Sequence, residues 1–125
     1  MHLDQPKFFC VDSEGTPWVK SRLAAGVEVK NLGKANGRAV QLVRFAPSTV
    51  FPEHLHSGPE FIYILSGSAV QNGCCLTPGW VGIAERGTVD RAFRSDTGCV
   101  FLLIYESRQF TESLVAESDP SRADN

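Results

Sequence analysis

Short runs of β-forming residues, separated by turn residues at close intervals, constrain this 125-residue chain more than any other feature. Asn72-Gly73 is a strong hairpin signal because both residues tolerate positive φ, and Pro78-Gly79 marks the next turn. No helical period precedes residue 107, so the pattern predicts an all-β, antiparallel sandwich or barrel of about nine or ten short strands. The expected strands are 8–11, 27–30, 38–46, 61–65, 68–71, 74–77, 80–84, 88–94 and 99–107.

The length fits one domain with a core of its own. We expect the barrel to span 1–109 and a polar C-terminal tail to span 110–125. A formal net charge of -2 and a pI near 5.9 give no basic field, which excludes nucleic acid and anionic membranes as favoured partners. The longest apolar runs are far too short to cross a bilayer, and no leader peptide is apparent, so we expect a cytoplasmic protein.

Four cysteines show no spacing typical of a structural zinc site. Cys10 and Cys99 lie in apolar runs and are expected to be buried. Cys74 and Cys75 lie beside the turn glycine Gly73, so one of them is expected to be exposed and open to oxidation, in a role that the sequence does not define.

Two histidines and a glutamate form the candidate site. His54 and His56 are separated by one residue, so in an extended segment both imidazoles point to the same side. Ser57 to Pro59 form a turn, and Glu60 begins the next strand, where its carboxylate can reach back to the same point. Two imidazoles and one carboxylate suit a divalent transition metal and leave positions for water or substrate. The alternative is a surface or pocket cluster held by hydrogen bonds.

The residues from His54 to Gly67 resemble the first motif of the cupin superfamily, His-x-His, three or four residues, Glu, six residues, Gly. The wider context is most similar to the ChrR-like cupins, which include anti-sigma-factor sensor domains and diketone or hydroxyacetophenone dioxygenase-like proteins. The resemblance implies a single-domain jelly-roll β-barrel. A glycine that the family places before the motif is Ser48 here.

The second cupin motif usually ends in a further histidine. The matching segment here is Glu85-Arg-Gly-Thr-Val-Asp90, so Asp90 takes that position and is the fourth candidate ligand. The alternative for Asp90 is an ion pair with one of three nearby arginines, Arg86, Arg91 and Arg94. His2 is the only other histidine, and its position at the start of the chain makes it an unfavourable ligand.

The resemblance implies a small metal-dependent dioxygenase acting on a carbonyl compound, with iron, zinc, nickel or manganese on His54, His56, Glu60 and Asp90. No residue is assigned a catalytic role apart from the metal site. A non-catalytic metal- or ligand-sensing module and a small-molecule-binding cupin remain as alternatives. We expect aromatic residues to wall a small-molecule pocket, and a homodimer to cover exposed strand edges. The five candidate wall residues are Phe45, Phe51, Tyr63, Trp80 and Phe93.

Overall fold

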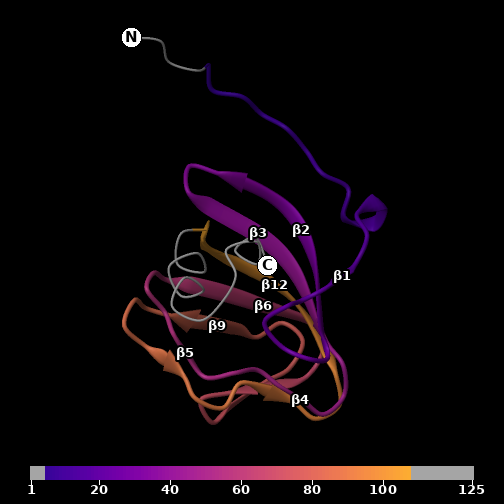
Figure 1. Ribbon diagram of the computed structural model, residues 1–125, viewed down its shortest axis with the longest axis vertical. Helices are drawn as coiled ribbons and strands as arrows, with labels where there is room; N and C mark the ends of the chain where they lie inside the picture. Colours follow the sequence, from indigo (N-terminus) through magenta and orange to yellow (C-terminus); the bar gives the residue numbers. More distant parts are fainter. Residues whose placement is uncertain (1–4, 108–125) are drawn as a thin grey trace.

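Two antiparallel sheets face each other in the computed structural model, which describes residues 5–107 (Figure 1). The strands are β1 (Val19–Lys20), β2 (Val27–Ala35), β3 (Arg38–Phe45), β4 (Thr49–Val50), β5 (His54–Leu55), β6 (Glu60–Gly67), β7 (Ala69–Gln71), β8 (Cys74–Leu76), β9 (Val81–Ala84), β10 (Val89–Asp90), β11 (Arg94–Ser95) and β12 (Cys99–Glu106). The larger sheet has the order β1-β2-β3-β12-β6-β9, the smaller one β4-β11-β7-β8, and β5 pairs with β10 in a separate ribbon. The last strand, β12, lies between β3 and β6, as in a jelly roll, which confirms the predicted fold class.

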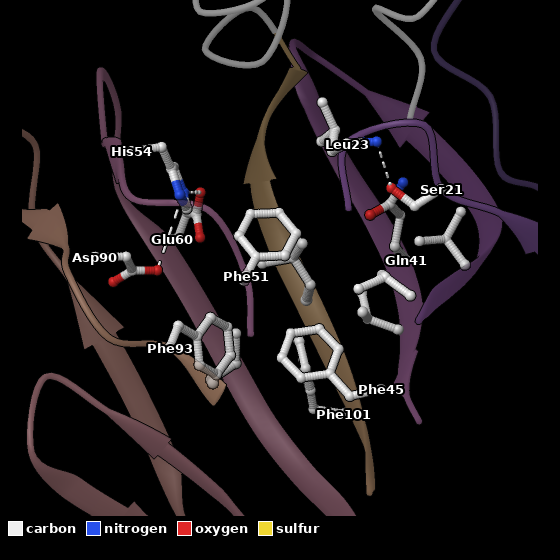
Figure 2. A pocket seen from close by; sticks show the side chains of 15 residues that line it. Ser21, Leu23, Gln41, Phe45, Phe51, His54, Glu60, Asp90, Phe93 and Phe101 are labelled. Carbon is white, nitrogen blue, oxygen red and sulfur yellow. Dashed lines mark hydrogen bonds and ion pairs between the residues drawn. The ribbon is translucent and has the colours of Figure 1, made fainter. Parts of the chain in front are cut away.

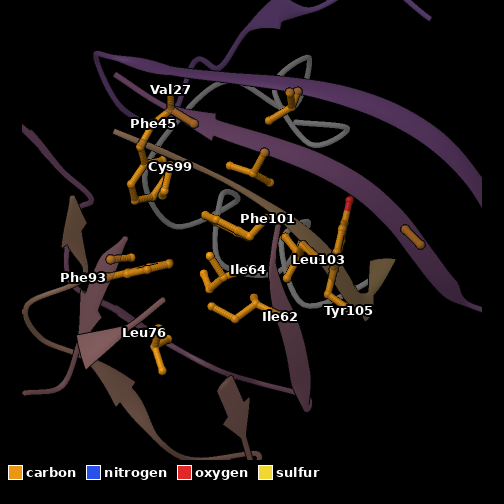
Figure 3. Close-up of a cluster of buried hydrophobic side chains, with 14 residues drawn as sticks. Val27, Phe45, Ile62, Ile64, Leu76, Phe93, Cys99, Phe101, Leu103 and Tyr105 are labelled. Carbon is orange, nitrogen blue, oxygen red and sulfur yellow. The ribbon is translucent and has the colours of Figure 1, made fainter. Parts of the chain in front are cut away.

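The core fills the space between the two sheets (Figure 3). Along β3 and β12 every second side chain is buried, because successive residues of a strand point to opposite faces. Phe45 of β3 is the centre of an aromatic cluster, with ring centroids 5.1 Å from Phe93 and 5.4 Å from Phe101. Burying each such ring contributes roughly 1.5–3 kcal/mol to the stability of the fold. The cluster therefore holds β3 and β12 of the larger sheet against the segment around Phe93, just before β11 of the smaller sheet.

Positive backbone φ angles mark the turns that the sequence identified. Asn72 and Gly73 both have positive φ, as the predicted hairpin between β7 and β8 requires. Gly67 ends β6 with φ +72°, and a Cβ there would collide with the backbone at Gly98. Ser48, where the family pattern has glycine, also has positive φ, at 65°, so the departure preserves the turn.

Three predictions differ from the structure. Residues 8–11 join no strand, since this apolar run pairs with no strand of either sheet, although the Phe9 ring lies close to Gly33 of β2 and Phe8 is 91% exposed. Cys10 in the same run is therefore exposed rather than buried, whereas Cys99 is buried, and Cys74 and Cys75 are both exposed. The segment 88–94 forms no single strand, because β10 pairs with β5 while β11 pairs with β4 and β7.

The predicted tail at 110–125 lies outside the described residues, so the domain boundary near residue 109 stays a prediction. Within residues 5–107, no helix is long and apolar enough to span a membrane.

Candidate metal centre

The four predicted residues meet at one place in the barrel. Figure 2 shows three of them, His54, Glu60 and Asp90, at the side of a pocket. β5 carries His54, the turn after it carries His56, and β6 begins with Glu60. Antiparallel pairing of β5 with β10 sets Asp90 directly opposite His54. Asp90, at the end of the second-motif segment, therefore lies beside the histidines and the glutamate of the first motif.

The donor atoms of the four side chains converge. One ligand atom from each residue lies within 4.8 Å of all the others. His56 Nε2 is 3.4 Å from both a Glu60 oxygen and an Asp90 oxygen. His54 Nε2 is 3.8 Å from Glu60 and 4.0 Å from Asp90. Ligands bound about 2.0–2.2 Å from one ion lie roughly 3–4 Å from each other, so these separations fit a single divalent ion.

Hydrogen bonds on the far side of each imidazole fix which nitrogen faces the cluster. The Thr88 hydroxyl donates to the carbonyl of Glu85, so its oxygen accepts from His56 Nδ1–H at 2.9 Å. His54 Nδ1 lies 3.3 Å from the carbonyl of Pro52, which can only accept. Both rings therefore direct Nε2 at the carboxylates. When Nε2 loses its proton, its lone pair has the orientation that a metal ligand needs.

Burial and charge shift the titration of the cluster. The His56 side chain is fully buried, and its Nε2 has no hydrogen-bond partner of good geometry. Burial lowers the pKa of His56, but Asp90 and Glu60 outweigh burial and raise that pKa to about 10. The pKa of His54 is raised by the same carboxylates against the effect of burial. Burial raises the pKa of Glu60, but the two histidines outweigh it and lower that pKa.

The raised pKa values of the two histidines show that the site favours a positive charge beside its two carboxyl groups. Two buried carboxylates carry two negative charges, and in the metal-free protein protonated imidazole compensates them. A divalent cation would supply the same compensation with both histidines neutral. The donor set, its charge and the buried Nε2 of His56 together fit a metal ion.

Gln71 of β7 holds Asp90 in place, and the sequence analysis missed it. Its Nε2 donates to both oxygens of Asp90, at 3.2 and 3.3 Å. Gly82 of β9 makes room for this side chain, because a Cβ there would lie 2.6 Å from the Gln71 amide oxygen. The sequence carries no local signal for Gln71, since it lies 19 positions before Asp90. Thr88 was also missed as a functional residue, although it stands in the second-motif segment.

The arginine alternative for Asp90 is not what the structure shows. Arg91 lies 3.7 Å from Glu53, and Arg94 lies 3.3 Å from Asp96. Among residues 5–107, no ion pair joins Asp90 to an arginine, and its side chain is 2% exposed.

Comparison with known proteins places the chain in a family. The model of the ChrR cupin-like domain matches residues 6–107. The chain belongs to the ChrR cupin-like family. No curated protein matches it by sequence.

Solved structures share the cupin fold at low sequence identity. A provisionally assigned acetylacetone dioxygenase from Methylibium petroleiphilum superposes with a TM-score of 0.77 at 14% identity, over 85% of this chain and 81% of that one. The polyketide cyclase RemF from Streptomyces resistomycificus gives 0.69 at 19% identity, over 79% of each chain. The anti-sigma factor ChrR of Rhodobacter sphaeroides, in complex with SigE, gives 0.65 at 20% identity, over 74% of this chain and 49% of that one.

In this ChrR-like cupin the side chains of the candidate metal centre lie at one wall of a small apolar pocket (Figure 2). His54, Glu60 and Asp90 line it on one side, and Gln41 and Ser21 provide polar groups elsewhere. The free volume is about 30 Å³, room for about two water molecules. The remaining lining is apolar, from Leu23, Val27, Val29, Val43, Phe45, Phe51, Ile62, Phe93, Phe101 and Leu103.

The prediction of aromatic walls is confirmed for three of five residues. Phe45, Phe51 and Phe93 line the cupin pocket. Tyr63 and Trp80 do not, being 45% and 52% exposed on the outside of the barrel. Tyr63 points outward because Glu60 points inward, and side chains an odd number of positions apart on a strand face opposite ways.

Proposed function

We propose that this cupin binds one divalent metal ion through His54, His56, Glu60 and Asp90 and acts as a dioxygenase on a small carbonyl compound. The observation that carries the proposal is the convergence of two imidazoles and two buried carboxylates on the wall of an apolar pocket. The fold similarity to a provisionally assigned acetylacetone dioxygenase supports the choice of chemistry.

The chain's own residues prepare the site for this role. Thr88 and the Pro52 carbonyl hold both imidazoles in the orientation that directs Nε2 inward. A bound divalent ion supplies Lewis-acid polarisation of a carbonyl oxygen and a centre for oxygen chemistry. The phenylalanine-rich lining leaves room for only about two water molecules, and electrostatic interactions are stronger in a pocket that holds so little water.

The donor set narrows the choice of metal. Two carboxylates and two imidazoles form a harder set than the three-histidine pattern usual in the superfamily. We therefore propose manganese or iron over zinc, nickel or copper.

Two measurements test the proposal together. Protein purified without a histidine tag should contain close to one equivalent of divalent metal, and a His56→Asn variant should contain far less. Iron-loaded protein should consume oxygen in the presence of one member of a panel of small β-diketones and aromatic ketones. An Asp96→Asn variant is the matched control, because that carboxylate is exposed and lies 3.3 Å from an arginine.

A metal-sensing module without turnover is the second candidate, and the pocket volume favours it. About 30 Å³ is too small for a diketone unless lining side chains such as Phe51 move. ChrR, which shares the fold, is an anti-sigma factor in complex with SigE. Stoichiometric metal without oxygen uptake on any panel member would support the sensor and contradict the dioxygenase.

Substoichiometric metal that does not rise on addition of iron, manganese, nickel or zinc would contradict both proposals. The remaining hypothesis would then be a cupin that binds a small molecule without metal. A cytoplasmic location and a homodimer both stay predictions from sequence.

A further inference from the structure

The strand β6 is apolar on both faces. Ile62 and Ile64 point into the core (Figure 3). Phe61, Tyr63 and Leu65 alternate with them and point outward, with 43%, 45% and 48% of their surface exposed. The inward face is explained by the core, but the outward face has no role in the barrel or the metal centre.

The register of the neighbouring strands extends this face into two apolar rows. Phe61 stands between Ile104 of β12 and Ile83 of β9. Tyr63 stands in the same way between Leu102 and Val81. Apart from the Tyr63 hydroxyl, the side chains of these two rows are apolar, and no charged side chain interrupts them across the three strands.

We define the outer patch as six exposed side chains at this end of the larger sheet: Phe61, Tyr63, Leu65, Trp80, Val81 and Ile83. An aromatic side chain presents roughly 150–250 Å², so its three aromatic members, each about half exposed, leave about 300 Å² in contact with water. The three aliphatic members bring the patch to roughly 500 Å², which is at the upper end for a monomer's largest apolar patch.

A second copy of this chain matches the patch better than the chain's own C-terminal segment does. Residues 108–125 contain only three large apolar side chains, Phe110, Leu114 and Val115, and their last eight residues contain none. A two-fold contact instead sets six apolar side chains against the same six, with no unpaired charge on either side. Two such patches bury roughly 1,000 Å² together, the lower limit for a specific interface.

We propose that the outer patch is the contact surface between two copies of this cupin. The contact uses the convex face of the larger sheet, so the pocket and its metal cluster on the inner side stay open to ligands. An area at the lower limit for a specific interface is typical of weak, transient contacts, so we expect the dimer to dissociate on dilution.

Sedimentation equilibrium of the full chain over a range of concentrations tests the proposal. The mass should approach twice 13.7 kDa at high concentration and fall toward 13.7 kDa on dilution. Tyr63→Glu and Ile83→Glu should each weaken association at least ~100-fold, because two-fold symmetry sets the new charges in an apolar contact. Both positions are exposed in the single chain, so thermal unfolding of the variants should resemble that of the wild type when each is measured as a monomer.

Val50→Glu is the matched control. Val50 is an aliphatic side chain 65% exposed, close to the 68% of Ile83, but it lies in β4 of the smaller sheet. The control should keep the dimer mass. A wild-type chain that stays monomeric at about 100 μM would overturn the proposal, as would a dimer unchanged by both patch variants. A dimer lost only when Phe8 of the exposed N-terminal run is changed to serine would also overturn it, because that run would then be the contact.

Discussion

Replacing Asp90 by asparagine should weaken metal binding at least ~100-fold, which corresponds to ~2.7 kcal/mol or more. The Asp90 oxygen nearest the cluster lies 3.4 Å from His56 Nε2, in the range expected for two ligands of one ion. Asparagine has the same shape but lacks the negative charge. Its amide oxygen can still accept from Gln71, so the substitution removes the negative charge of the proposed ligand and keeps an acceptor for the Gln71 amide.

The assay is a titration of the metal-free protein with Mn²⁺ by competition against a chelating dye, at two pH values. Two values are needed because Asp90 helps raise the pKa of His56 to about 10. Without that carboxylate, protons compete less strongly for His56, which offsets part of the loss at neutral pH. The loss of affinity should therefore be larger at the higher pH.

Asp96→Asn is the control, because its carboxylate is 72% exposed and lies beside an arginine, and it should change affinity less than about twofold. A double variant, Gln71→Ala with Asp90→His, restores the usual family histidine and the space that its ring needs. That variant should bind zinc better than the Asp90→Asn protein does. Affinity within threefold of wild type in Asp90→Asn would refute the assignment of Asp90 as a ligand.

Three further predictions concern the surroundings of the site and the fold. Thr88→Val should weaken metal binding ~10-fold, because it removes the acceptor of His56 Nδ1–H, whereas Thr97→Val at an exposed hydroxyl should not. Metal binding near neutral pH should release about one proton from His56, and metal affinity should rise roughly tenfold per pH unit toward pH 10, as calorimetry can measure. Protonated His56 stabilises the metal-free protein, so the free energy of unfolding should fall as pH rises from ~6.5 to 10, as thermal melting can measure. Gly67→Ala should cost at least ~2 kcal/mol of stability in chemical denaturation and Gly73→Ala less, because both have positive φ but only Gly67 meets a backbone contact.

The first motif could be predicted because its geometry is local. His54 and His56 share a side of an extended segment whatever the rest of the chain does, and Glu60 follows after one turn. Asp90 required the second motif of the family, since its approach depends on the pairing of β5 with β10, and no local pattern specifies that pairing. Gln71 depends on still more distant packing.

The two errors about exposure have different physical origins. The run 61–65 is apolar on both faces, so hydrophobicity alone does not show which face is buried. The required inward direction of Glu60 fixes that choice and sends Tyr63 outward. For residues 8–11 β-propensity was a poor guide, because a strand needs a hydrogen-bonded partner and this run pairs with no strand of the two sheets.

The change from histidine to aspartate at the fourth ligand position has consequences beyond the ligand itself. Aspartate is shorter than histidine, so a barrel shaped for an imidazole would leave both a gap and a free carboxylate oxygen near Asp90. Gln71 fills that space and donates to both oxygens, and Gly82 is needed because any side chain there would meet the Gln71 amide. The carboxylate is thereby held beside His56 without a compensating arginine, and its charge remains available to the site. Three positions from three different strands thus act as one unit, and with Asp90 as the proposed fourth ligand this unit would make the donor set harder than the usual one.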